Sequence, residues 1–271
     1  MKAFLYGVPI GMLGGLIGLG GAEFRLPVLT GVFEYSAKQA IPLNLAISLF
    51  TVVAAFSTRA SLTSLHSLLP IVPLLCMLGI GSMLGAHVGS GYVYRLHDLG
   101  VEKLVTALLI IIEVLLIAES FWVFEARQLF NSSEINLLLG VFFGLCIGLI
   151  SSFLGVAGGE VIIPTLVLVF GVDIKDAGTG SLLVSTAPIL VGMVRYGQQR
   201  RYRSQSDLIH IMAPMGIGSV IGAVVGGMML GILPGKHLNL LLGLLLIVSA
   251  VKVFRFKTER KIILERNGKA R

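Results

Sequence analysis

Charged residues are scarce in this 271-residue chain, where Asp, Glu, Lys and Arg together make up only 13%. The chain also has one Trp and two Cys, whereas hydrophobic residues account for 55% and the mean hydropathy is +0.93. This fraction of charged residues is too small for the surface of a water-soluble domain of this size. The composition excludes a soluble globular protein and predicts an all-α, multi-pass membrane protein that contacts the lipid bilayer.

Cysteine and catalytic motifs are equally sparse. Cys76 and Cys146 lie in separate apolar segments, with no CxxC spacing and no histidine at metal-ligand spacing. The sequence lacks HExxH, GxSxG and Walker A motifs, and no set of Asp, His and Ser has catalytic spacing. We therefore predict no disulfide, no metal site, no cofactor and no enzymatic activity.

Positive charge exceeds negative charge, and the formal net charge is +7. A basic protein can bind nucleic acid, but here Lys and Arg gather in short loops and in the C-terminal tail, as the positive-inside rule describes. We therefore predict no nucleic-acid partner. Lys2 precedes an apolar stretch, as in a signal peptide, but no small-residue cleavage region follows, so we expect the first helix to be retained.

Eight hydrophobic segments approach or exceed the length of about 20 residues that crosses a bilayer. They cover approximately residues 3–33, 37–57, 70–94, 101–124, 136–170, 177–196, 208–230 and 238–256. The first and fifth run past thirty residues and contain glycines, a glutamate and a proline. We expect each of these two to break near the middle of the membrane, and then either to continue or to return as a re-entrant hairpin.

The two interrupted segments are copies of one another. Residues 11–27, GMLGGLIGLGGAEFRLP, align without gaps with residues 148–164, GLISSFLGVAGGEVIIP, at an offset of 137. The same offset relates later small residues, such as Gly85 and Gly222, which we expect to serve helix packing. The predicted organisation is a first membrane repeat (1–124), a linker (125–135), a second membrane repeat (136–257) and a basic cytoplasmic tail (258–271).

Equivalent loops of the two repeats differ in Lys and Arg content. Residues 58–69 contain only Arg59, whereas residues 195–206 contain four arginines. If Lys and Arg mark the cytoplasmic side, the halves are inverted relative to each other, each crosses the membrane an odd number of times, and both termini are cytoplasmic. Eight plain crossings are the alternative.

Polar residues early in the second and sixth segments are candidates for a binding site beside the breaks. Asn44 and Ser48 are spaced i, i+4 and share one helix face, as do their repeat equivalents Ser181 and Ser185. Two half-helices that meet near the midplane would direct backbone N–H groups to one point, which suits a small oxyanion. The alternative is that these side chains bond to their own helix or to a neighbouring one.

Ionisable residues also lie inside the apolar segments. Glu23 and Glu160 occupy equivalent repeat positions, and Glu113 lies mid-segment. Because a carboxylate repels an anion, these groups either carry a proton with the anion or have a structural role, such as binding freed N–H groups at a break. Arg25 is equivalent to Ile162, so it could neutralise Glu23 or contact a substrate from one side only.

The doubled GxxxxxxGxxGxExxxP pattern, in a basic chain of this size, resembles the TauE/SafE sulfite exporter family, also called the TSUP family. The resemblance covers nearly the whole chain. By motif position it implies a substrate region made of Gly20, Gly21, Ala22 and Glu23 together with Ala157, Gly158, Gly159 and Glu160. The first copy departs from the usual pattern, because it reads GGAE where a third glycine is common.

The resemblance implies a transporter of small sulfur-containing anions or organosulfonates, such as sulfite, thiosulfate or sulfoacetate, in a bacterial inner membrane. We expect a secondary transporter that works by alternating access of its two halves, with proton coupling as one option. A passive anion channel of the same fold is the rival function. A membrane scaffold subunit is a more distant one, since a scaffold has little use for paired midplane breaks. We predict no particular oligomeric state.

Overall fold

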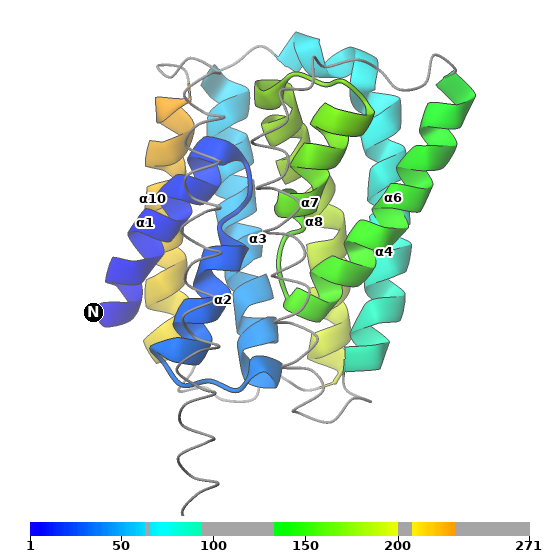
Figure 1. Ribbon diagram of the computed structural model, residues 1–271. Helices are drawn as coiled ribbons and strands as arrows, with labels where there is room; N and C mark the ends of the chain where they lie inside the picture. Colours follow the sequence, from blue (N-terminus) through cyan, green and yellow to red (C-terminus); the bar gives the residue numbers. More distant parts are fainter. Residues whose placement is uncertain (63–64, 94–132, 200–207, 231–271) are drawn as a thin grey trace, which may run out of the picture.

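A computed structural model describes residues 1–62, 65–93, 133–199 and 208–230 (Figure 1). All regular secondary structure in these ranges is helical. The helices, in chain order, are α1 (Lys2–Ile17), α2 (Ala22–Gly31), α3 (Ala37–Leu62), η1 (Leu65–Ile71), α4 (Val72–Val93), α6 (Ser133–Leu154), α7 (Gly159–Pro164), η2 (Thr165–Val169), α8 (Ile174–Gln198), η3 (Leu208–Met212) and α10 (Ala213–Met229). The predicted fourth and eighth segments, Glu113, most of the linker and the basic tail lie outside the described residues.

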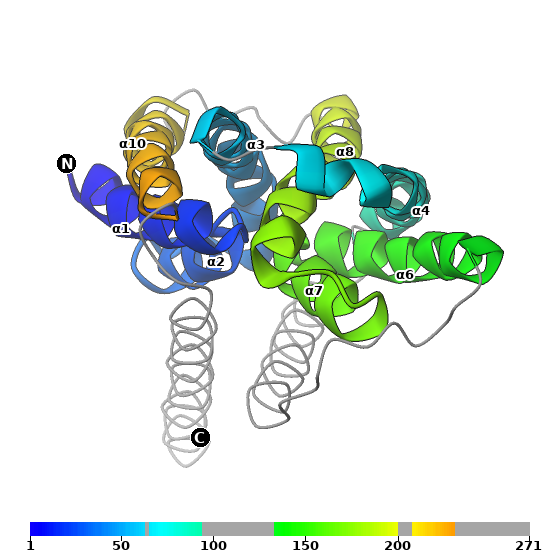
Figure 2. The ribbon, with the colours of Figure 1, turned by 90° about the horizontal axis from the view of Figure 1, so that it is seen from above.

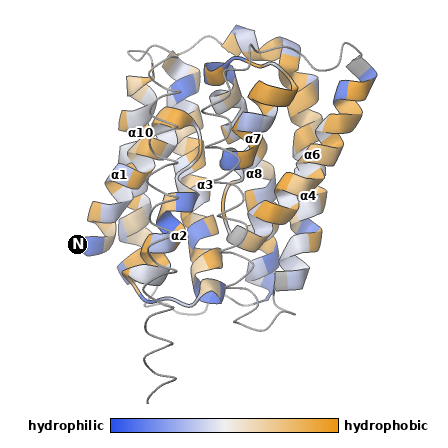
Figure 3. Cartoon of the chain, in the orientation of Figure 1, coloured by the Kyte–Doolittle hydropathy of each residue, from blue (hydrophilic) through white to orange (hydrophobic). Residues whose placement is uncertain are grey.

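Five of the described helical stretches are long and apolar enough to cross a membrane. They are Ala37–Leu62, Leu65–Tyr92, Glu134–Phe153, Ile174–Gln198 and Ile209–Met229. Their outer surfaces carry exposed apolar side chains, such as Leu138 at 73% and Val194 at 60% exposure, and hydrophobic colours dominate α6 in Figure 3. Such a surface suits lipid rather than water, and the predicted all-α, multi-pass membrane fold is confirmed.

Both interrupted segments break at their glycines, as predicted. Residues 18–21 separate α1 from α2, and residues 155–158 separate α6 from α7. The φ angles are 98° at Gly18, 72° at Gly21, 62° at Gly155 and 81° at Gly158. Residues other than glycine rarely adopt these φ angles, so the glycines determine where each helix ends and the next begins.

The prolines of the repeated motif lie beyond the breaks. Pro27 is inside α2, and Pro164 is the last residue of α7, where the α-helix changes into the π-helical turn η2. Proline lacks an N–H group and crowds the preceding turn, which fits a change of helix type at Pro164. The expectation that the prolines help to break the helices is therefore wrong: the glycines alone flank the breaks.

Each broken segment folds back as a hairpin (Figure 1). α1 rises from the N-terminus and α2 descends after the break, whereas α6 descends and α7 rises. Of the two alternatives for these segments, the hairpin is the one observed. The two hairpins differ in length, because α6 has 22 residues and is long enough to cross a membrane by itself, whereas α1 has 16.

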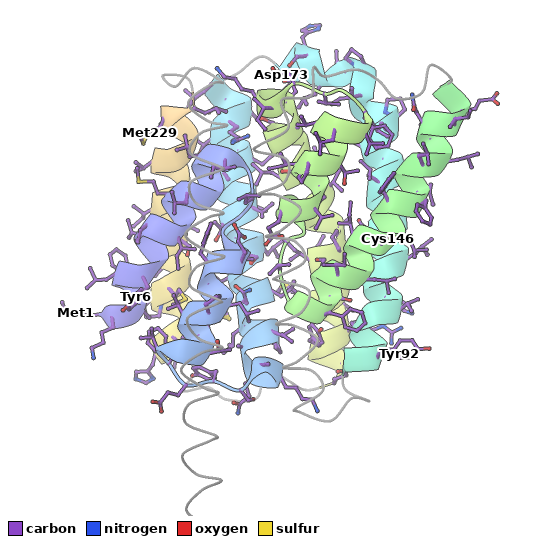
Figure 4. The ribbon with its side chains drawn as sticks, in the orientation of Figure 1. Met1, Tyr6, Tyr92, Cys146, Asp173 and Met229 are labelled. Carbon is purple, nitrogen blue, oxygen red and sulfur yellow. The ribbon has the colours of Figure 1, made fainter. Side chains whose placement is uncertain are left out.

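Equivalent helices of the two halves run in opposite directions. α3 begins at the lower end of Figure 1, whereas α8 begins at the upper end, next to Asp173 in Figure 4. α4 ends beside Tyr92 at the lower end, whereas α10 ends at Met229 at the upper end (Figure 4). This is the relation that inverted repeats would have.

The halves exchange packing partners. In Figure 2, α1 lies beside α10 on one flank and α6 lies beside α4 on the other, so each flank combines both repeats. The contact is between backbones: a Cβ atom added to Gly222 of α10 would lie 2.0 Å from the carbonyl oxygen of Val8, and one added to Gly85 of α4 would lie 2.1 Å from that of Leu145. Gly85 and Gly222 therefore serve helix packing, as predicted.

Candidate functional site

The two breaks touch each other. A Cβ atom added to Gly159 would lie 2.8 Å from the Cα atom of Leu19, and one added to Gly20 would lie 3.4 Å from the Cβ atom of Ala157. The motif residues of both breaks are buried, namely Gly20, Gly21, Ala22, Glu23, Ala157, Gly158, Gly159 and Glu160. Two stretches 137 residues apart in sequence thus form one buried junction. Ala22 is the first residue of α2 and has no positive φ angle, so its departure from glycine causes no backbone strain.

Each break is held by a helix of the opposite half. The side-chain amide of Asn44 on α3 donates to the carbonyl oxygens of Gly155 and Ala22, both at 2.9 Å. The hydroxyl of Ser181 on α8 donates to the carbonyl oxygen of Gly18 at 2.6 Å. The repeat offset relates the two donors and also relates Gly18 to Gly155. Of the two roles left open for these side chains, the structure shows bonds to neighbouring segments.

Arg25 is fully buried beside this junction. Its Nη1 donates to Asn44 Oδ1 at 3.2 Å and to Ser48 Oγ at 2.9 Å, and its Nη2 donates to Thr51 Oγ1 at 3.2 Å and to Ser219 Oγ at 3.3 Å. The Nε atom has no hydrogen-bond partner within the described part of the chain. All four side-chain acceptors are neutral, so the guanidinium brings positive charge into the site with one donor still unused.

Arg25 forms no hydrogen-bonded ion pair with Glu23. Both carboxyl oxygens of Glu23 lack a hydrogen-bond donor among the described residues, although the two charges are close enough to interact. The repeat equivalent of Arg25 is Ile162, which is also fully buried. The buried positive charge beside the junction therefore belongs to the first half only.

Glu23 and Glu160 meet at the junction. They lie in the first turns of α2 and α7, which follow the two touching breaks, and they are only 6% and 3% exposed. Their carboxyl groups are close enough to interact electrostatically. None of the four oxygens accepts a hydrogen bond from a donor in the described ranges. Hydrogen bonds from Asn44 and Ser181, rather than to these carboxylates, therefore hold the breaks.

Ser185 shows how the asymmetry of the site affects its second half. It is the repeat equivalent of Ser48 and is likewise buried, but its hydroxyl has no hydrogen-bond partner in the ranges described. Ser48 meets the guanidinium of Arg25, whereas the aliphatic Ile162 offers Ser185 no polar group. The two halves therefore carry different polar groups at equivalent positions.

Arg59 was not among the predicted site residues, and its expected place in a loop is wrong. It is fully buried in α3, where its Nε donates to the carbonyl oxygen of Gly15 at 3.0 Å and its Nη2 to that of Leu16 at 2.6 Å. These carbonyls lie in the last turn of α1, where a helix lacks partners and favours a cation. Tyr196 occupies the position of Arg59 in the second repeat, and its hydroxyl donates to the carbonyl oxygen of Ser152 at 2.8 Å. Ser152 in turn occupies the position of Gly15.

No group of three or more His, Cys, Asp or Glu side chains in the described ranges could hold a metal ion. The polar groups of the junction are instead a guanidinium, hydroxyls, an amide and two carboxyls. Among these groups, the Nε atom of Arg25 and the hydroxyl of Ser185 are the donors without a partner in the described ranges, and a guanidinium suits an oxyanion.

Comparison with known proteins gives two matches. A family model described as "Sulfite exporter TauE/SafE" matches residues 3–253. A protein of Methanocaldococcus jannaschii described as "Probable membrane transporter protein MJ0441" is 24% identical over 197 residues, which cover 71% of this chain and 70% of that protein. No solved structure matches the chain.

Proposed function

The chain belongs to the sulfite exporter TauE/SafE family and is a multi-pass membrane transporter; from this premise, we propose that it carries a small sulfur-containing oxyanion or organosulfonate across a bacterial inner membrane. Sulfite, thiosulfate and sulfoacetate represent the proposed substrate class. The observation that supports an anionic substrate is the buried guanidinium of Arg25, which bonds to neutral side chains beside the junction and keeps its Nε donor unused. An ionisable group at such depth is expensive to bury and is usually functional.

The proposed site lies where the two breaks meet. Its contacts would come from the backbone of residues 20–23 and 157–160 and from the side chains flanking them, which are Arg25, Asn44, Ser48, Ser181 and Ser185. An anion there would meet the unused Nε donor of Arg25, the unpartnered hydroxyl of Ser185 and backbone donors of the breaks, without needing further buried cations. The donors of Asn44, Ser48 and Ser181 already bond to carbonyl oxygens, so these side chains would have to release them to bind the anion. Glu23, Glu160 and Glu113 are the candidates for carrying a proton with the anion.

Alternating access of two inverted halves is the proposed mechanism. Two observations support it: equivalent helices run in opposite directions in Figure 1, and equivalent donors, Asn44 and Ser181, hold the break of the opposite half. In transporters built from inverted repeats, one half rocks against the other around a fixed midplane site. With Lys and Arg on the cytoplasmic side, this arrangement gives two cytoplasmic termini.

Uptake of labelled sulfite, thiosulfate and sulfoacetate into proteoliposomes tests the proposal. We expect the parent protein to carry at least one of them faster than protein-free liposomes do, and Arg25→Gln to reduce that uptake. Ser90→Ala is the control variant, because the hydroxyl of Ser90 is buried but bonds only to its own helix at the carbonyl of His87. A folded parent that carries none of the three anions contradicts the substrate class.

The same liposomes separate a coupled transporter from a passive channel. A pH gradient imposed across the membrane drives a proton-coupled transporter to accumulate the anion above its external concentration. Under clamped membrane potential, a channel only equilibrates the anion, whatever the pH gradient. Accumulation that follows the pH gradient supports coupling, and equilibration alone supports the channel.

A further inference from the structure

Glu23 and Glu160 occupy equivalent positions in the two repeats and lie at the junction where the two breaks meet. Each carboxyl group comes from the first turn of the short helix that follows a break, and the two breaks meet where Gly159 packs against Leu19. None of the four carboxyl oxygens has a hydrogen-bond partner among the described residues. Both side chains are almost completely buried. Each repeat therefore contributes one carboxyl group to the pair. The pair lies where the two halves would move relative to each other during alternating access.

Few charges act on this pair. Besides Glu160, Arg25 on α2 is the charged side chain in the described ranges that interacts with Glu23. The packed helices α3 and α8 each contribute one buried titratable residue, but Arg59 bonds to the end of α1 and Tyr196 bonds to Ser152. The other charged side chains described on α1, α3 and α8 are not buried. Within the described residues, one guanidinium therefore acts on the pair, through its interaction with Glu23.

Two carboxylates in contact at a buried site repel each other strongly, and such pairs hold a proton between them. When the pair holds one proton, the protonated carboxyl group donates a hydrogen bond to the carboxylate of the other residue. This bond satisfies oxygens that have no other hydrogen-bond donor among the described residues. The pair then carries one negative charge, opposite the single positive charge of Arg25. Loss of that proton leaves two negative charges, which would repel any anion brought to the junction.

We propose that Glu23 and Glu160 form one proton-binding site that bridges the two halves, and that its single proton must be bound before the anion can bind. Glu23 and Glu160 are then not two independent carriers. The proton comes from water on one side of the membrane and returns to water on the other, so one proton accompanies each anion bound. This inference deepens the proposed function and rests on it for the link to the anion, whereas the shared proton itself follows from the geometry.

Infrared spectroscopy of the full-length protein in detergent tests the shared proton without any transport. The parent should show the C=O stretching band of a protonated carboxylic acid at neutral pH. Glu23→Gln and Glu160→Gln should each remove that whole band, because the amide N–H of glutamine replaces the shared proton as the donor to the remaining carboxylate. Glu134→Gln is the control and should leave the band unchanged, because Glu134 is exposed at the start of α6.

Transport in proteoliposomes gives the second readout. Uptake by the parent should fall about tenfold per pH unit above its midpoint, since one proton is required, whereas each single Gln variant should vary no more than about twofold over the same range. The double variant should show no pH dependence beyond that of either single variant.

Three outcomes overturn the shared site: no protonated carboxyl band in the parent, a band that survives either Gln variant, or pH-dependent uptake that both variants retain. Size-exclusion chromatography of each variant verifies that it is folded. An intact parent band that both variants lose, combined with no transport of any tested anion, would instead contradict the proposed substrate class and leave the shared proton standing.

Discussion

The side-chain amide of Asn44 donates a hydrogen bond to the carbonyl oxygen of Gly155 at 2.9 Å, and so joins a spanning helix of the first repeat to the break of the second. Ser181 makes the equivalent bond to Gly18 at 2.6 Å. The offset of 137 residues relates both donors and both acceptors. Because each half holds the break of the other, neither break can shift relative to the opposite helix without disturbing one of these bonds.

Asn44→Ala should destabilise the protein more than Ser181→Ala does. Asn44 donates to two carbonyls, those of Ala22 and Gly155, and also accepts from Arg25, so its removal leaves several buried groups unsatisfied. We expect a loss of about 2–4 kcal/mol in the free energy of unfolding for Asn44→Ala and about 1 kcal/mol for Ser181→Ala. Denaturation of the purified protein in detergent measures both.

Ser90→Ala is the matched control for this pair, because Ser90 is buried and its hydroxyl returns to its own helix. Its loss should cost no more than about 0.5 kcal/mol. If Asn44→Ala proves no more destabilising than Ser90→Ala, the bonds between the halves contribute nothing measurable.

Arg25→Lys should weaken anion binding even though it keeps the positive charge. A single ammonium group cannot reach the four side-chain oxygens that the guanidinium contacts on α3 and α10. We expect the KM for the transported anion to rise about tenfold or more. Initial uptake rates at a series of anion concentrations measure it.

Arg59→Lys is the control for Arg25→Lys, since Arg59 is equally buried but donates hydrogen bonds to the end of α1 and to Thr179. This variant should lower the denaturation midpoint and leave KM within about twofold of the parent. If the KM rises as much for Arg59→Lys as for Arg25→Lys, Arg25 has no specific role in binding the anion.

The sequence was sufficient to predict features that are local or that the repeat duplicates. The glycines at positions 18, 21, 155 and 158 indicate where the helices break. Glycine readily adopts the positive φ angles that such turns require, and other residues rarely do. Asn44 and Ser181 were found because a polar pair recurs at the same offset. The all-helical membrane fold followed from hydropathy alone.

Contacts between distant segments could not be predicted in the same way. Hydropathy indicates which face of a helix avoids water, but it does not indicate which helix will cover that face. Because α1 packs mainly against α10 of the other half, Ser219 of α10 reaches Arg25. Arg59 was assigned to a loop since it closely follows an apolar segment. Its alignment with Tyr196, at the end of a segment, was the available signal that the position is buried.

Tyr196→Phe should test whether Tyr196 replaces Arg59 in the second half. It removes one buried hydrogen bond, to the carbonyl of Ser152, and should cost about 1 kcal/mol in the free energy of unfolding. Arg59→Ala removes the bonds to Gly15 and Leu16 together with the packed side chain and should cost about 3 kcal/mol or more.

Tyr6→Phe provides the reference for Tyr196→Phe, because the ring of Tyr6 is 39% exposed. We expect it to change the free energy of unfolding by less than about 0.5 kcal/mol. A Tyr196→Phe variant as stable as Tyr6→Phe would mean that the bond to Ser152 is not needed to secure the end of α6.

Two pairs of glycines test the exchange of packing partners: Gly222 with Gly216 on α10, and Gly85 with Gly79 on α4. The repeat makes each pair a replicate of the other. Gly222 contacts the backbone of α1 and Gly85 that of α6, whereas a Cβ atom added to Gly216 or Gly79 would meet nothing within 4 Å. Alanine at Gly222 or Gly85 should therefore force the helices apart and cost about 1–3 kcal/mol in the free energy of unfolding. Alanine at Gly216 or Gly79 should be neutral or should stabilise its helix by up to about 1 kcal/mol. Detergent denaturation of the four variants gives the comparison, and equal effects within a pair would contradict the backbone contact between the two repeats.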